Sequence, residues 1–164
     1  MKMTEISNTK LSPPRPLSIK LISFGFLFGG VSRCLNLATA AFPLGIYFSP
    51  GLPVFIYNLL IGVTFVFSGI GLWRLQEEMR RLAIGLLCWT TLNTILMYAV
   101  PSNYAKMLNW MSQSLGTLPA PVFESMTFRI GAIVGAVIIT AVQIWFLGKW
   151  GSLFVKSATS SQQT

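Results

Sequence analysis

The sequence has no histidine and no aspartate, and all its acidic residues are glutamates. The absence of histidine removes the commonest metal ligand and the usual proton exchanger near neutral pH. Charged residues make up only 10% of the chain, whereas a soluble domain is usually about 25% charged. This small number of charges cannot cover a water-facing surface. The composition therefore predicts a protein whose solvent is lipid. It predicts no catalytic residue, no metal site and no cofactor.

Cysteine is also scarce. Cys34 and Cys88 each lie inside an apolar run and lack metal-ligand spacing. We expect both thiols to be inert small hydrophobic groups within the apolar runs. A disulfide between them is the alternative, although nothing indicates a disulfide-stapled scaffold. The net charge of +8 does not indicate nucleic-acid binding, because the basic residues lie at the ends of apolar runs.

Four apolar runs dominate the chain, each close to the ~20 residues that cross ~30 Å of hydrocarbon as a helix. We predict an all-α membrane protein in which residues 17–150 form a four-transmembrane-helix bundle. The predicted spans are 17–42, 53–73, 82–100 and 128–147. We expect residues 1–16 to be a disordered cytoplasmic tail and residues 151–164 to be a second one, disordered from about residue 157.

The first run has an alternative interpretation. Its basic start, apolar stretch and small-residue segment Ala38-Thr39-Ala40 are similar to a signal peptide with its cleavage site. We favour a retained helix, because the run is too long for the apolar region of a signal peptide and Arg33 interrupts it.

Basic residues divide unequally between the two sides of the predicted bundle. If the four helices alternate in direction, one side carries Lys2, Lys10, Arg15, Lys20, Arg74, Arg80, Arg81, Lys149 and Lys156. The other carries Lys106 and Arg129. The positive-inside rule then places both termini in the cytoplasm. The expected aromatic anchors are Trp73, Trp145 and Trp150 on the inner side, and Tyr47, Tyr98 and Tyr104 on the outer side.

The segment 74–81 predicts a short charged hairpin between the second and third spans. Arg74 and Glu78, and likewise Glu77 and Arg81, are four residues apart, a spacing that contributes ~0.2–0.5 kcal/mol per pair. We expect a solvated turn that sets the topology. Docking of an acidic partner or of anionic lipid headgroups is the alternative.

The external segment 101–127 is the longest predicted loop. Apolar residues recur in it at helical intervals, at Tyr104, Met107, Leu108, Met111 and Leu115. This pattern predicts a short amphipathic surface helix that Gly116 ends. Packing is the expected role, and a lid over a lipid-accessible cavity is the alternative.

Small and polar residues form stripes within the spans. Lipid does not drive helices together as water does, so close backbone approach and interhelical hydrogen bonds matter more. We therefore predict helix packing at Gly25, Gly29, Gly62, Gly69, Gly131 and Gly135. The alternative is a polar cavity with hydrogen-bonding amides at Asn36, Asn58, Asn93 and Gln143.

Arg33 is the residue singled out within the spans, because it lies about two-thirds of the way along the first one. A central arginine costs about 2.5–3.5 kcal/mol on translocon scales, so it needs a partner. Glu124 on the outer side, or Asn and Thr groups in the bundle, could supply one. We expect an internal pin or a contact with lipid phosphate. The alternatives are an anion or lipid-headgroup site, or a helix that ends early and leaves Arg33 at the surface.

Three segments carry a recognisable pattern: Arg15-Pro-Leu-Ser-Ile-Lys-Leu21, Gly-Leu-Trp-Arg-Leu at 71–75 and Arg-Arg-Leu-Ala-Ile-Gly at 80–85. With these segments the chain resembles small uncharacterised four-helix bacterial membrane proteins. The resemblance covers about half of the chain and implies a bacterial inner-membrane setting. It supplies no catalytic residues.

The sequence favours a non-enzymatic structural or accessory subunit of a larger membrane assembly. Its expected partners are membrane lipids and other membrane subunits or a second copy, with no nucleic acid. The alternative is a small oligomeric transporter or channel, or a lipid- or anion-binding protein, that uses Arg33 and the amides. The predicted spans hold no acidic residue or histidine, which argues against proton or cation coupling. An enzyme acting on lipid is disfavoured, because Glu124 is the one carboxylate expected on the outer side and general acid–base work needs a positioned titratable group. Nothing in the sequence indicates a bound pigment or quinone.

Overall fold

The computed structural model describes residues 15–36, 51–115 and 125–154, and every element assigned in these ranges is a helix. The helices are α1 (Leu17–Leu35), α2 (Leu52–Trp73), α3 (Glu77–Ala99), α4 (Pro101–Leu115) and α6 (Met126–Lys149). Four of them, α1, α2, α3 and α6, are long and apolar enough to cross a membrane. The prediction of an all-helical chain with four such helices is confirmed. A helix, α4, is also found in the segment predicted to lie on the surface.

Some sequence predictions concern residues outside these ranges. They concern residues 1–14 and 155–164 of the two tails and the first span beyond residue 36. They also concern Ala38-Thr39-Ala40, Tyr47, Gly116 and Glu124. Within the described part, α1 ends at Leu35, because the Asn36 backbone leaves the helical conformation (φ −107°, ψ 38°) and its side-chain amide donates to the Ser32 carbonyl. Arg33 therefore lies in the last turn of α1, where a cation interacts favourably with the helix dipole.

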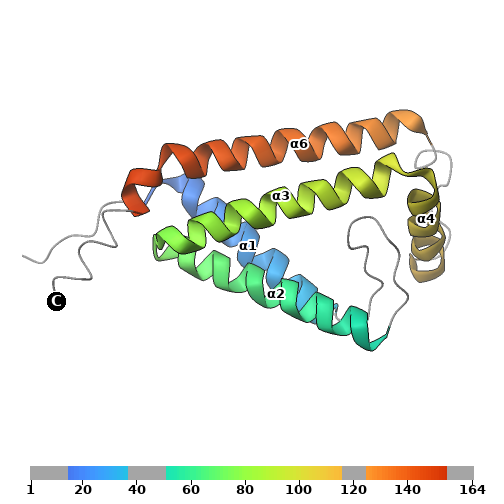
Figure 1. Ribbon diagram of the computed structural model, residues 1–164, viewed down its shortest axis with the longest axis horizontal. Helices are drawn as coiled ribbons and strands as arrows, with labels where there is room; N and C mark the ends of the chain where they lie inside the picture. The colour runs from blue at the N-terminus through green and yellow to red at the C-terminus, as the bar shows by residue number, and fades with distance from the viewer. Residues whose placement is uncertain (1–14, 37–50, 116–124, 155–164) are drawn as a thin grey trace, which may run out of the picture.

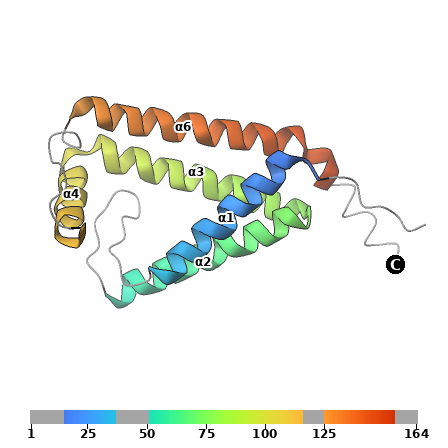
Figure 2. The same cartoon turned by 180° about the vertical axis from the view of Figure 1, so that it is seen from behind.

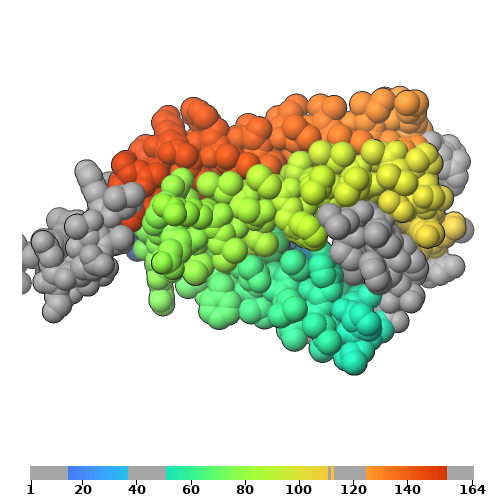
Figure 3. All heavy atoms as spheres, in the orientation of Figure 1, coloured from blue at the N-terminus to red at the C-terminus, as the bar shows by residue number. Residues whose placement is uncertain are grey.

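The helices form two antiparallel pairs that meet at one end of the molecule (Figures 1 and 2). α1 packs along α2, and α3 packs along α6; Figure 3 shows the atoms of α3 and α6 in contact along their lengths. The pairs meet where α1 and α3 begin and where α2 and α6 end, which we call the junction end. From there α2 diverges from α3 toward the opposite end, the open end, where α4 lies (Figure 1).

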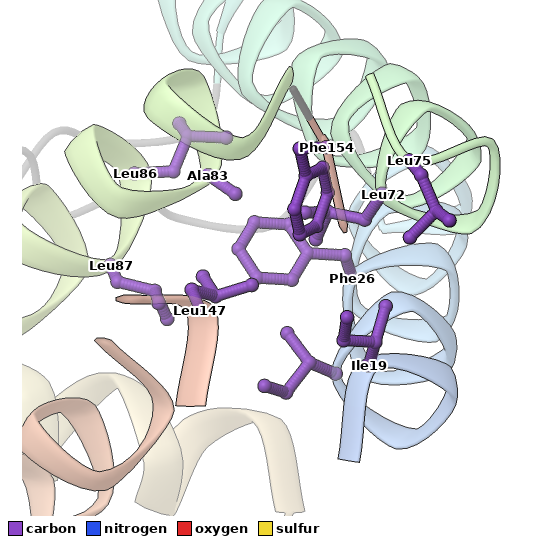
Figure 4. Packing of buried hydrophobic residues seen from close by; sticks show 10 residues of the cluster. Ile19, Phe26, Leu72, Leu75, Ala83, Leu86, Leu87, Leu147 and Phe154 are labelled. Carbon is purple, nitrogen blue, oxygen red and sulfur yellow. The ribbon is translucent and has the colours of Figure 1, made fainter. Parts of the chain in front are cut away.

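Buried side chains from all four long helices fill the junction end (Figure 4). The cluster consists of Ile19, Ile22, Phe26, Leu72, Leu75, Ala83, Leu86, Leu87, Leu147 and Phe154. Inside a membrane, lipid tails replace the hydrophobic gain that water would give, so van der Waals packing of this kind holds helices together. The cluster is therefore what joins the two pairs.

The turn between α2 and α3 is a Schellman motif. The Gln76 N–H donates to the Gly71 carbonyl at 2.9 Å, and the Leu75 N–H donates to the Leu72 carbonyl at 3.1 Å. Leu75 has the left-handed conformation, with φ of 58°, which costs a residue with a Cβ about 1–2 kcal/mol. Its side chain is buried in the junction cluster, and this packing offsets the cost.

Candidate functional site

α1 and α2 approach each other most closely at glycines. A Cβ atom added to Gly30 would lie 2.7 Å from the Gly62 carbonyl oxygen and 2.8 Å from the Val66 backbone nitrogen. One added to Gly69 would lie 3.0 Å from the backbone nitrogen of Leu27. These neighbours are backbone atoms, so a methyl group at either position would push the helices apart. Gly62 and Gly69 were predicted to pack, and Gly30 was not.

The face of α1 that is buried differs from the predicted stripe. It carries Ile19, Ile22, Ser23, Phe26 and Gly30. A Cβ added to Gly25 would meet no atom of the described part within 4 Å, and one added to Gly29 would meet only Phe65, at 3.8 Å. Bulky side chains on this face fill the junction cluster and so decide how α1 is rotated. The spacing of Ser23, Leu27, Gly30 and Cys34, four, three and four, is the signal that could have identified this face.

The predicted glycines of α6 face away from the other described helices. The Thr140 hydroxyl shares a hydrogen bond with Thr91, so that side of α6 faces α3. At 3.6 residues per turn, Gly131 and Gly135 lie on the opposite side. A Cβ added to either would meet no described atom within 4 Å. In α6 only Leu147 is buried by the described residues, whereas α2 has seven buried residues, so most of the α6 surface can contact lipid or another protein.

Arg33 lies where the end of α1 contacts α2. Its Cβ lies 3.3 Å from the position of a Cβ added to Gly62, and its guanidinium lies 5.8 Å from the centre of the Phe65 ring. A cation above an aromatic face gains about 0.5–2 kcal/mol. Within the ranges described above, the guanidinium donates to no carboxylate or other acceptor. The site thus offers an arginine fork beside an aromatic ring, a group suited to phosphate or carboxylate.

Two of the predicted amides lie toward the open end near Arg33. Asn36 is exposed, and its amide donates to the Ser32 carbonyl at 2.8 Å. Asn58 is buried on α2, one turn before Gly62. Both belong to the same half of the α1–α2 pair as Arg33.

The other two amides are on the second helix pair. Asn93 is half-buried on α3, and Gln143 is half-buried on α6, one turn before Leu147 of the junction cluster. Among the described residues, the Arg33 guanidinium makes no hydrogen bond with either of these amides. Glu124, the predicted acidic partner, lies outside the described residues.

A charged cluster caps the junction end. The Nε and Nη2 atoms of Arg80 donate to the two carboxylate oxygens of Glu77 at 2.6 Å, and Arg81 donates to the same carboxylate at 3.0 Å. Arg80 also donates to the Leu147 carbonyl at 3.4 Å and lies 5.8 Å from the Phe154 ring centre. The hydrogen bonds from Arg80 lower the pKa of Glu77 from 4.5 to about 2. Glu77 lies in the hairpin, before the predicted span, and ties the start of α3 to the end of α6 through Arg80.

Of the two ion pairs predicted in the hairpin, one is confirmed. Glu77 and Arg81 form it on the first turns of α3. Among the described residues Arg74 and Glu78 form no ion pair, because the left-handed turn at Leu75 separates the end of α2 from the start of α3.

At the open end, Arg129 of α6 contacts both α3 and α4. It donates to the Tyr98 carbonyl at 2.9 and 2.6 Å and to the Ala99 carbonyl at 3.2 Å. These carbonyls end α3 and have no partner within that helix, so a cation there is favourable. The guanidinium also lies 5.1 Å from the Tyr104 ring centre, which links α4 to α3 and α6. Sequence reasoning counted Arg129 only as an external charge, because no local pattern connects it with residues 30 or 31 positions away.

Within residues 15–36, 51–115 and 125–154, no three His, Cys, Asp or Glu side chains lie close enough to hold a metal ion. Both cysteines are free; Cys34 is half-buried against α2 and Cys88 is exposed. No family model matches the sequence, and neither a curated protein nor a solved structure is found to be similar to it.

Proposed function

We propose that this chain is a non-enzymatic multi-pass protein of a bacterial inner membrane. Its four long helices form a transmembrane bundle with both termini in the cytoplasm. Its role is that of a structural or accessory subunit, which packs against another transmembrane helix.

The distribution of charge supports this orientation. The described cations at the junction end are Arg15, Lys20, Arg74, Arg80, Arg81 and Lys149. Arg33, Lys106 and Arg129 are the described cations at the open end. Under the positive-inside rule, the junction end faces the cytoplasm.

The proposed subunit role rests on the small-residue face of α6, which no other described helix covers. The α1–α2 pair shows what such residues do in this chain, because Gly62 and Gly69 are in tight contact with α1. Gly131 and Gly135 have small-xxx-small spacing, four positions apart, but no neighbouring helix in the described part. Ile138 and Val142 continue this face and are exposed. Glycines in this spacing allow close helix–helix approach in membranes, whereas lipid tails do not require them.

The partner is either a different membrane subunit or a second copy of the chain. Extraction in a mild detergent, followed by measurement of the protein mass in the micelle, distinguishes them. We expect a mass above the 18.1 kDa of one chain, and co-purifying proteins identify the partner.

A double variant, Gly131→Leu with Gly135→Leu, should give the mass of one chain. The matched control, Ile130→Leu with Val137→Leu, changes exposed residues on another side of α6 and should leave the complex intact. A wild-type mass of one chain with no partner, or a complex unaffected by the glycine variant, would remove the proposal.

Arg33 favours a second candidate, a small oligomeric transporter or channel or an anion- or lipid-binding protein. Its guanidinium lies beside Phe65 and has no hydrogen-bond acceptor in the described part. Anion flux from liposomes would be compared for wild type, Arg33→Gln and the exposed open-end control Lys106→Gln. Loss of flux in Arg33→Gln alone supports this candidate, and equal flux in all three removes it.

A further inference from the structure

The junction end carries more positive charge than its carboxylates neutralise. Glu77 is bound by Arg80 and Arg81. Four more described cations lie at this end, and we call them the junction cations: Arg15, Lys20, Arg74 and Lys149. None of them forms an ion pair with a described residue. The described part of this end has one further carboxylate, the exposed Glu78. The junction cations therefore present a net positive surface.

Tryptophans hold two of the junction cations in place. The Arg15 guanidinium lies 5.6 Å from the Trp73 ring centre. The Lys149 ammonium lies 5.0 Å from the ring centre of Trp145 and 5.7 Å from that of Trp150. Tryptophan is enriched at the level of lipid headgroups, so cations stacked on these rings lie at the depth of the lipid phosphates. Lys20 and Arg74 are exposed at the same end.

Exposed apolar side chains continue from the junction cations toward the open end. Along α1 they are Leu17, Leu21, Phe24, Phe28, Val31 and Leu35, each 48–80% exposed, at alternating spacings of four and three. On α2, Ile70 and Trp73 are exposed beside Arg74. A soluble acidic protein would contact only the charged end, whereas a phospholipid matches both a cationic end and an apolar stripe beneath it.

We propose that the junction cations bind the phosphate of anionic phospholipids, with the acyl chains lying along the exposed stripe of α1. This inference rests on the proposed membrane location and not on the partner of α6. Each Lys or Arg near an anionic surface contributes about 1 kcal/mol, which corresponds to about fivefold in affinity. The junction cations come from α1, α2 and α6, so a bound lipid also tends to hold the two helix pairs together.

Native mass spectrometry of the full chain in detergent tests the proposal. It is titrated with phosphatidylglycerol or with phosphatidylcholine of identical acyl chains. We expect tighter binding of phosphatidylglycerol. The Arg15→Gln, Arg74→Gln double variant should weaken that binding at least fivefold and leave phosphatidylcholine binding unchanged. The control Lys106→Gln, which removes an exposed cation from α4 at the open end, should change either affinity less than twofold.

Equal affinity of the wild type for the two lipids overturns the proposal, as does an equal loss in Lys106→Gln. The single variant Lys149→Gln keeps the test decisive if the double variant does not fold, with an expected loss of about fivefold for phosphatidylglycerol. In parallel, a polyglutamate peptide is titrated into the full chain in the presence of phosphatidylcholine. If its binding depends on the junction cations while phosphatidylglycerol is not preferred, the surface serves an acidic protein and the proposal is wrong.

Discussion

Gly30 and Gly25 lie five positions apart on α1, and the same substitution should have opposite effects at the two sites. A methyl group at Gly30 would lie 2.7 Å from the Gly62 carbonyl oxygen and 2.8 Å from the Val66 backbone nitrogen. Ordinary contact begins at 3.4 Å, so α1 and α2 would have to separate by several tenths of an ångström. At Gly25 a methyl group meets no described atom within 4 Å.

The magnitudes follow from two opposing effects. Replacing glycine by alanine inside a helix favours the helix by up to ~1 kcal/mol. Overpacking a close contact costs ~1–3 kcal/mol. Gly25→Ala should therefore be neutral or stabilising, and Gly30→Ala should be destabilising. We expect the two variants to differ by about 2 kcal/mol, or roughly 4–8 °C in the unfolding midpoint.

Cys34 provides the assay, because its sulfur lies at the same interface. A Cβ added to Gly62 would be 2.7 Å from it. In a Cys88→Ala background, Cys34 is the single thiol of the chain. Heating the protein in detergent with a thiol-reactive dye reports when α1 separates from α2. Equal midpoints for the two variants, or a higher midpoint for Gly30→Ala, would refute the packing described at Gly30.

Three further predictions are checked by the unfolding midpoint in detergent, followed by tryptophan fluorescence, which needs no reactive thiol. Ser68→Ala should stabilise by about 1 kcal/mol, because the Ser68 hydroxyl is buried without a hydrogen-bond partner in the described part; a lower midpoint would contradict this. Arg129→Met should destabilise by ~1.5–3 kcal/mol, because methionine removes the charge-assisted hydrogen bonds to two carbonyls of α3; an unchanged midpoint would argue against the cap. The pKa of Glu77 is about 2 instead of 4.5, so its contribution to stability is complete above about pH 4.5 and is lost as the pH falls toward 2. Glu77→Gln should lack that loss, and parallel pH profiles for the two proteins would refute it.

The long helices were predictable because their length and apolar composition are those of segments that can cross a membrane. A run such as residues 53–73 must be apolar over ~20 residues, and α2 begins and ends within one residue of that prediction. The end of the first helix was less predictable. The apolar run continues beyond Asn36, but the Asn36 backbone leaves the helical conformation and its side-chain amide donates to the Ser32 carbonyl.

The rotation of each helix could not be derived from small residues alone. Gly25, Gly29 and Gly30 all offer close approach, and a shift of one residue turns the face by 100°. What decides among them is the junction cluster, where Ile19 and Phe26 pack against residues far away in the sequence. A single-helix pattern holds no information about that partner surface.

The charged contacts at the two ends show the same limit. The Glu77–Arg81 pair was predictable because both residues lie on one helix, four positions apart. The bonds from Arg80 to the Leu147 carbonyl and from Arg129 to the Tyr98 carbonyl join residues 67 and 31 positions apart. They depend on how the helix pairs are placed, which periodicity does not report.

The central claim is that a partner helix packs on the glycine face of α6. A photoreactive amino acid placed at position 138 or at position 137, in native membranes, tests it most directly. Ile138 and Val137 are neighbours and both exposed, but Ile138 shares the face of Gly131 and Gly135 while Val137 points about 100° away. The account predicts a protein–protein adduct from position 138 and only lipid adducts from position 137. Equal protein adducts from both positions, or none from 138, would contradict it.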